Sequence, residues 1–180
     1  MTGLRIGLAQ VDAVLGGFSA NVEKILEYVK RSQEKRCDLV AFPELSLFGY
    51  LPMDLLERKS IYEAQWKEFE KLNKLLPANI GVLVGVVAPS LEGKGKPYGN
   101  AVALLQKNKR VKLFFKELLP NYDVFDDTRF FEPGNNGDNF FELKGNKVLV
   151  TICEDIWNSN AVKALKSPDF IISVNASPYE

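Results

Sequence analysis

Three residues of this 180-residue chain have side chains suited to catalysis and stand where an apolar segment ends. Glu44 closes "CDLVAFPE", Lys116 follows "VKLFF", and Cys153 follows "KVLVTI". A carboxylate can act as a general base, a thiol as a nucleophile, and an ammonium group as a stabiliser of developing negative charge. Because neighbouring strands of a layered α/β sheet can end at one place, these three side chains are candidates for a single site.

Each of the three residues also has a structural interpretation. Cys153 on its own is more often a buried structural cysteine, and Glu44 can be a solvated strand end or a helix cap. Lys116 can be an exposed lysine whose aliphatic part covers an apolar strand. If Cys153 is catalytic, we expect nearby backbone amides and the dipole of a helix beginning after it to stabilise the thiolate.

The composition narrows the chemistry further. The chain has no histidine, which excludes a Ser-His-Asp or Cys-His pair and a His-ligated metal within it. Any base must therefore be a carboxylate, a lysine or a tyrosine. Its 23 basic and 23 acidic residues cancel, so the charge does not indicate a nucleic-acid or membrane partner, and we expect a small-molecule ligand.

The cysteines and the apolar runs indicate a reduced, cytoplasmic protein. Cys37 and Cys153 are far apart and form no CxxC pair, so neither a disulfide framework nor a zinc site is predicted. The most apolar run, "IGVLVGVVA", is much shorter than the roughly 20 residues of a membrane-spanning helix. The amino terminus lacks the pattern of a signal peptide.

The hydrophobic pattern predicts strands and helices in a mixed order. One helix is expected to begin at a Ser19 cap, and others at 60–76 and 159–167. Strands are expected in "LRIGLAQVDA", at 37–44, 80–89 and 100–106, in hairpins ending at Lys116 and Cys153, and as a buried strand in "DFIISVNAS". This order favours an α/β or α+β layered fold over an all-parallel sheet.

Two further features concern organisation. Residues 117–139 form a long segment rich in proline, glycine and aromatics, which indicates a functional loop. The sequence stops just after a predicted core strand, and we interpret residues 1–180 as one incomplete domain.

The strings "AFPELSLFGY", "LFFKELLPNYDVFDDTRFFEPG" and "VTICEDIW" resemble, in this order, the motifs of the nitrilase (carbon-nitrogen hydrolase) superfamily. Within it, "FGYLPMDLL", "LPNYDVFDDTRFF" and "NASPY" are similar to the glutaminase domains of glutamine-dependent NAD synthetases. The resemblance spans nearly the whole chain. It implies a four-layer αββα sandwich that is incomplete at the carboxyl end.

The resemblance also implies a mechanism. Glu44 is the expected general base, Cys153 the nucleophile that attacks the glutamine carboxamide, and Lys116 the stabiliser of the oxyanion, helped by the backbone N–H that follows Cys153. Ammonia leaves, and water then releases glutamate from a thioester. At Asp127 the family usually has glutamate near the lysine, and Asp126 is the alternative carrier of that role.

Substrate contacts and partners are implied by the same resemblance. Tyr50 and Tyr122 are expected to line the glutamine pocket, with core packing as the alternative for both, and Glu154 and Ser177 to bind the amino-acid end. No cofactor is expected for amide hydrolysis. ATP and magnesium belong to an absent synthetase domain that consumes the ammonia, and a homo-oligomer is expected.

Two other functions remain open from the sequence. The same three residues can serve a stand-alone amidase acting on another small amide. Alternatively, the chain can be an inactive fragment that acts as an interaction or oligomerisation module, because a missing layer leaves apolar surface exposed.

The sequence predicts that the two cysteines differ in function. Cys153→Ala should abolish amide hydrolysis because it removes the nucleophile, whereas Cys37→Ala should leave it intact. Assays of both purified variants, with circular dichroism to verify folding, test this. Equal loss of activity in two folded variants would contradict the assignment.

Overall fold

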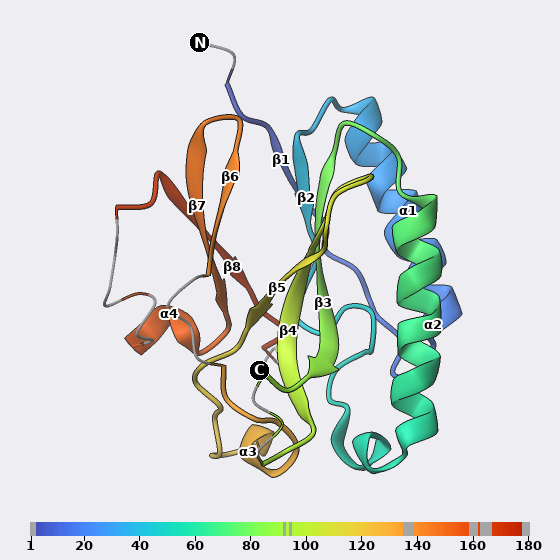
Figure 1. The fold of residues 1–180 in the computed structure, drawn as a ribbon, viewed down its shortest axis with the longest axis vertical. Helices are drawn as coiled ribbons and strands as arrows, with labels where there is room; N and C mark the ends of the chain where they lie inside the picture. The colour runs from blue at the N-terminus through green and yellow to red at the C-terminus, as the bar shows by residue number, and fades with distance from the viewer. Residues whose placement is uncertain are drawn as a thin grey trace.

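A computed structural model describes residues 3–91, 93, 95–134, 139–158, 162 and 167–177. Two β-sheets are stacked face to face, and two long helices cover the outer face of the larger sheet (Figure 1). The mixed α/β fold predicted from the sequence is therefore confirmed.

The larger sheet has five strands in sequential order. They are β1 (Ile6–Leu8), β2 (Leu39–Ala41), β3 (Gly81–Pro89), β4 (Tyr98–Leu105) and β5 (Lys112–Phe115). The pairs β1–β2 and β2–β3 are parallel, whereas β3–β4 and β4–β5 are antiparallel. Strands β1, β2, β3 and β5 therefore all point the same way, so the segments that leave β2 and β5 emerge at the same end of the sheet.

The smaller sheet has three described strands, β6 (Phe140–Leu143), β7 (Asn146–Ile152) and β8 (Phe170–Val174), in the order β6-β7-β8. The predicted hairpin joins β6 to β7, and β7 pairs with β8 in parallel. Cys153 follows β7 directly.

Helices α1 (Phe18–Glu34) and α2 (Lys59–Leu75) pack side by side on the larger sheet (Figure 1). Their apolar positions repeat at helical spacing, and each helix buries one stripe against the sheet. Three short helices lie elsewhere: η1 (Met53–Glu57), α3 (Asp127–Phe130) and α4 (Asp155–Asn158).

Alternation of side chains along each strand gives the larger sheet two apolar faces. Val40, Val82 and Val84 face the helices, while Leu39, Leu83 and Phe114 face the smaller sheet. The two buried faces explain why β3 and β4 read as continuous apolar runs.

Two local predictions are wrong. Ser19 does not cap α1, because the helix begins at Phe18 and so contains Ser19; Gly17 is at the cap position, with no side-chain cap. Strand β8 is not fully buried: its side chains alternate, and Ile171 is 39% exposed. The helix predicted at 159–167 lies almost entirely outside the described residues.

The described residues thus make three layers, helices, sheet and sheet (Figure 1). The four-layer sandwich remains an expectation. On the edge strand β1, Ile6 packs toward the smaller sheet, whereas Leu8, two residues later in the same strand, is 77% exposed.

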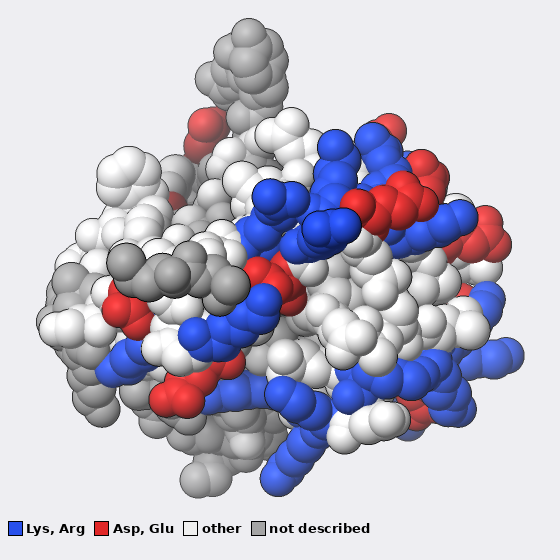
Figure 2. Space-filling view, turned by 90° about the horizontal axis from the view of Figure 1, so that it is seen from above, with Lys and Arg blue, Asp and Glu red and all other residues white. Residues whose placement is uncertain are grey.

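Charged side chains gather on the end of the molecule that lies opposite the strand ends carrying Glu44, Lys116 and Cys153 (Figure 2). Figure 2 views the opposite end of the molecule, where lysine and arginine side chains form a band with acidic side chains among them. Within the described residues, no helix is long and apolar enough to cross a membrane.

Gly85 of β3 lies against the backbone of the segment that contains Glu44, with no room for a side chain between them. A Cβ atom at Gly85 would lie 2.6 Å from the Pro43 carbonyl oxygen and 2.7 Å from the Glu44 carbonyl carbon, and would also clash with the Leu45 backbone nitrogen. Gly85→Ala should therefore displace the segment around Glu44 and lower the free energy of unfolding by about 1–3 kcal/mol. Urea denaturation measures the change.

Gly3→Ala is the matched control, because a Cβ there meets nothing within 4 Å. It should change stability by less than about 0.5 kcal/mol. Equal stability of the two variants would show that this backbone contact is not tight.

Candidate active site

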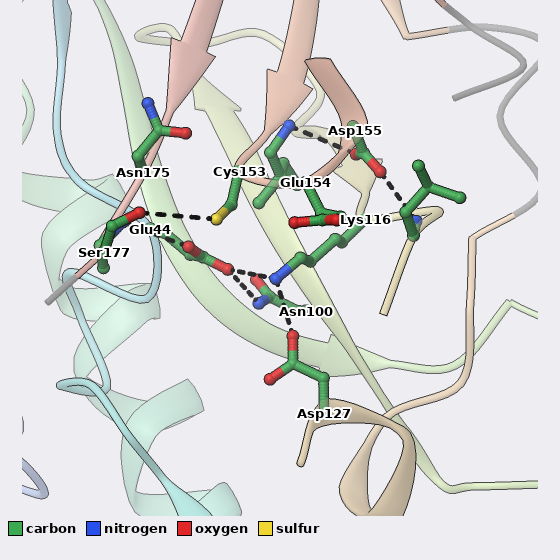
Figure 3. Close-up of polar contacts among 12 residues, drawn as sticks. Glu44, Asn100, Lys116, Asp127, Cys153, Glu154, Asp155, Asn175 and Ser177 are labelled. Atoms are coloured by element: carbon green, nitrogen blue, oxygen red, sulfur yellow. Dashed lines mark hydrogen bonds and ion pairs between the residues drawn. The ribbon is translucent and has the colours of Figure 1, made fainter. Parts of the chain in front are cut away.

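The structure brings Glu44, Lys116 and Cys153 together from both sheets (Figure 3). Glu44 lies in the turn after β2, Lys116 directly follows β5, and Cys153 directly follows β7. The prediction that the three residues meet is therefore confirmed, although Glu44 lies in the turn after its strand and not at the end of the strand.

Lys116 lies between two carboxylates, with no exposed surface. Its Nζ is 2.9 Å from Glu44 Oε1 and 2.7 Å from Asp127 Oδ2. Burial by itself lowers the pKa of Lys116, but the two carboxylates outweigh it and raise the pKa above its ordinary value. The ammonium group is therefore charged at neutral pH, and the stability that it contributes is lost only as the pH rises through this higher value.

Glu44 is itself almost fully buried and has its two oxygens held differently. Oε1 accepts hydrogen bonds from Lys116 Nζ and, at 2.7 Å, from Asn100 Nδ2. Oε2 accepts one from the Ala176 backbone N–H at 3.2 Å. The segment after β8 thus reaches the base, and Oε2 keeps more capacity than Oε1 to accept a proton.

Asn100 was not among the residues predicted from the sequence. It lies in β4 and is 1% exposed, and its side-chain oxygen has no hydrogen-bond partner in the described structure. Its backbone carbonyl accepts from the Lys116 N–H at 2.8 Å, so Asn100 contacts both Glu44 and Lys116. The available signal was an amide residue inside the otherwise apolar run "YGNAVALL".

Cys153 adopts a backbone conformation that is uncommon for a residue with a side chain. Its φ is +47°, in the left-handed region, and its backbone N–H donates to the Val174 carbonyl at 2.9 Å. Such positions cluster at functional sites because the surrounding structure must impose them. Here β8 fixes the turn that presents the half-buried thiol.

The thiol is protonated at rest. Burial, followed by the nearby charge of Glu44, raises the pKa of Cys153, although Lys116, Ser177 and the backbone N–H of Glu154 act in the opposite direction. The expected stabilisation of the thiolate by amides and a helix dipole is thus outweighed. The nucleophile requires a base, and Glu44 is the adjacent one (Figure 3).

Asp127, at the start of α3, is the acid that reaches the lysine. The alternative, Asp126, is exposed and its side chain does not contact Lys116. The shorter aspartate side chain therefore reaches the ammonium group of Lys116 directly (Figure 3).

Tyr50 is half-buried, and its hydroxyl has no partner in the described structure. Burial, and then the charges of Glu44, Asp127 and Cys153, raise the pKa of Tyr50, which places the phenol close to the site. The ring packs on the apolar cluster around Phe48, which supports the packing interpretation, and the contact with glutamine stays a prediction.

Tyr122 and Glu154 form a pair at the surface. Tyr122 is 55% exposed, which contradicts the core-packing alternative, and its hydroxyl donates to Glu154 Oε2 at 2.9 Å. On the other side of the thiol, Ser177 Oγ lies 3.9 Å from Cys153 Sγ. These predicted substrate-binding residues therefore flank the nucleophile.

A cavity of about 610 Å³ lies next to this pair. Tyr122, Glu154 and the exposed Trp157 line it, whereas Glu44, Lys116 and Cys153 do not. It is therefore beside the reacting atoms rather than over them. Among the described residues, no group of three or more His, Cys, Asp or Glu side chains could hold a metal ion.

Comparisons with known proteins agree with this geometry. Residues 5–180 match the carbon-nitrogen hydrolase family. The glutamine-dependent NAD(+) synthetase of Acinetobacter baylyi is 35% identical over 182 residues, which cover 100% of this chain and 32% of that protein. The chain spans about a third of the length of such relatives and is homologous to their amino-terminal part.

Solved structures show the same fold. The glutamine-dependent NAD+ synthetase of Acinetobacter baumannii, solved with ADP, superimposes with a TM-score of 0.89 at 35% identity, covering 98% of this chain and 33% of that one. An amidase from Nesterenkonia sp. gives 0.81 at 20% identity, covering 98% and 66%, and shows likeness of fold. The chain belongs to the carbon-nitrogen hydrolase family.

Proposed function

We propose that this chain hydrolyses the side-chain amide of glutamine to glutamate and ammonia through a thioester on Cys153. The observation that carries the proposal is the buried ammonium of Lys116, held against Glu44 beside a free thiol. The family relationship supports a carbon-nitrogen hydrolase, and relatives named glutamine-dependent NAD(+) synthetases support glutamine as the amide.

In the first half of the reaction, Glu44 takes the thiol proton and the sulfur of Cys153 attacks the carboxamide carbon. The oxyanion forms against Lys116 Nζ and the backbone N–H of Glu154. One such donor is typically worth about 3 kcal/mol of transition-state stabilisation. Glu44 then returns the proton to the amide nitrogen, ammonia leaves, and a glutamyl thioester remains.

In the second half, Glu44 deprotonates a water molecule, which attacks the thioester carbon. The same donors hold the second oxyanion. When it collapses, the carbon-sulfur bond breaks, the proton on Glu44 passes to the sulfur, and glutamate departs. Glu44 can serve in both halves because Lys116 and Asn100 both donate to Oε1, whereas Oε2, with one donor from Ala176, is the oxygen that would carry the proton.

Substrate orientation is assigned to the residues around the thiol. Tyr50 and Tyr122 would line the side of the pocket, and Glu154 and Ser177 would bind the amino-acid end of glutamine. The unpartnered hydroxyl of Tyr50 supports a role in ligand contact, because a buried hydroxyl normally has a partner.

The ammonia has a proposed destination. In the relatives, the matched segment is about a third of an NAD synthetase, so we propose that a synthetase domain uses ATP and magnesium to amidate deamido-NAD with this ammonia. Residues 1–180 would then be the glutaminase part, with no cofactor of its own and a homo-oligomeric assembly.

The first experiment is labelling with 6-diazo-5-oxo-L-norleucine, an electrophilic glutamine analogue, followed by intact-mass measurement. We expect one adduct per chain, on Cys153, which excess glutamine suppresses and which is absent from Cys153→Ala. The reason is that the ketone of the analogue takes the place of the glutamine carboxamide and its diazo carbon takes the place of the amide nitrogen; once this carbon is protonated, the Cys153 sulfur forms a bond to it and N2 leaves.

Hydrolysis rates for glutamine, asparagine and simple aliphatic amides complete the test. Preference for an aliphatic amide, with labelling insensitive to glutamine, would replace the glutaminase proposal with the amidase. Absence of both labelling and hydrolysis in a folded sample that self-associates would favour the interaction module.

Asn100→Ala should lower kcat for glutamine hydrolysis by about tenfold or more, because Glu44 Oε1 loses one of its two donors and the base is held less firmly in position. KM should change much less, since Asn100 is not assigned to substrate binding. Steady-state ammonia release measures both constants.

Asn146→Ala is the control, because in the part of the chain that the structure describes this side chain donates only to the backbone carbonyls of Leu143 and Lys144, at 3.1 and 3.2 Å. It should keep wild-type kcat. A wild-type kcat for folded Asn100→Ala would remove Asn100 from the catalytic apparatus.

A further inference from the structure

Asp155 is a second buried carboxylate near the site, and the proposed reaction does not use it. It is the first residue of α4, two positions after the nucleophile, and is 1% exposed. Its carboxylate contacts neither Cys153 nor Glu44 in the described structure; instead it accepts backbone hydrogen bonds.

The donors come from two segments that are distant in sequence. Oδ1 accepts from the backbone N–H groups of Glu117 at 3.0 Å and Leu118 at 2.8 Å. Oδ2 accepts from the N–H of Ile152 at 3.3 Å. Glu117 directly follows Lys116, and Ile152 directly precedes Cys153, so one carboxylate joins the backbone on either side of the reacting groups (Figure 3).

We propose that Asp155 is a positioning residue that holds the Lys116 segment and the Cys153 turn in the register needed for attack and oxyanion stabilisation. The inference rests on the proposed function, because it concerns the same site. It follows from the geometry, since no side chain of the catalytic trio itself connects the Cys153 turn to the backbone after Lys116 in the described structure.

Charge is important to this role. An ionised carboxylate accepts with both oxygens, whereas an amide accepts with one and presents donors at the other. Burial raises the pKa of Asp155 to about 6, although the three N–H groups and Lys116 act to lower it. Asp155 is therefore ionised at pH 8. Because its pKa is higher in the folded protein than in the unfolded chain, folding nevertheless favours the neutral carboxyl over the ionised one.

The raised pKa of Asp155 and its proposed positioning role give opposite expectations for removal of the charge: stability should not fall, whereas the rate of catalysis should. A folded-state pKa above the ordinary value means that the ionised group destabilises the fold as the pH rises past that range. Asp155→Asn removes the charge, keeps an acceptor for Glu117 and Leu118, and loses the acceptor for Ile152. A purely structural residue would lower stability when changed, without a specific effect on the reaction of the folded protein.

The test compares wild type with Asp155→Asn at pH 8 in three measurements. The urea unfolding midpoint should be no lower than that of wild type. The kcat for glutamine should fall by about 10- to 100-fold with KM nearly unchanged, because a displacement near 1 Å at the reacting groups has that effect. Iodoacetamide labelling of Cys153, which does not require glutaminase activity, should also slow by about tenfold.

Asp169→Asn is the matched control. Asp169 also accepts a backbone N–H, from Lys147 at 2.6 Å, but at the opposite end of β7 from Cys153. It should keep wild-type kcat and labelling rate. Asp155→Ser, which is smaller and uncharged, is the second variant if Asp155→Asn does not fold.

The outcomes separate the two proposals. A wild-type protein whose Cys153 is labelled but does not hydrolyse glutamine contradicts the proposed function, and the labelling rates of the variants still test Asp155. The positioning role is overturned if folded Asp155→Asn keeps the wild-type kcat and labelling rate, or if both Asp155 variants unfold.

Discussion

The site depends on the burial of one ammonium group between two carboxylates. The chain has no histidine, and the base beside the thiol is a carboxylate; two carboxylates in a water-poor interior repel each other. Lys116 offsets this repulsion while contacting Glu44 and Asp127 at once. Removing one member of such a buried group typically costs about 3–5 kcal/mol, because the remaining charge is left unpaired. The same contact holds the charge needed for oxyanion stabilisation beside the base.

The two-sheet arrangement explains how short strands can build this site. Glu44 lies in the turn after β2 of the larger sheet, Lys116 directly follows β5, and Cys153 directly follows β7 of the smaller sheet. The segment after β8 completes it, since the backbone of Ala176 contacts Glu44 and that of Val174 contacts Cys153. Backbone groups therefore supply much of the positioning, and they are hard to change by substitution.

Stability and reactivity oppose each other at several positions. Cys153 occupies the left-handed region, Lys116 is fully desolvated, and Asp155 is ionised although burial favours its neutral form. Such features persist only where the surrounding core stabilises them. Here the apolar contact between the sheets, which includes Phe114 and Val150, provides that stabilisation directly behind the reacting groups.

The sequence by itself determined the catalytic candidates and most of the elements, because strand ends, helical spacing and turn residues are local signals. It predicted the meeting of Glu44, Lys116 and Cys153. It did not predict the proposed roles of Asn100 or Asp155, because Asn100 donates to Glu44, 56 residues away, and Asp155 accepts from Glu117 and Leu118, 38 and 37 residues away. Tertiary structure also decided that Asp127 rather than Asp126 reaches the lysine, and that the thiol is protonated at rest. Hydrogen bonds and pKa values depend on distance and burial, and these are fixed only when the sheets pack together.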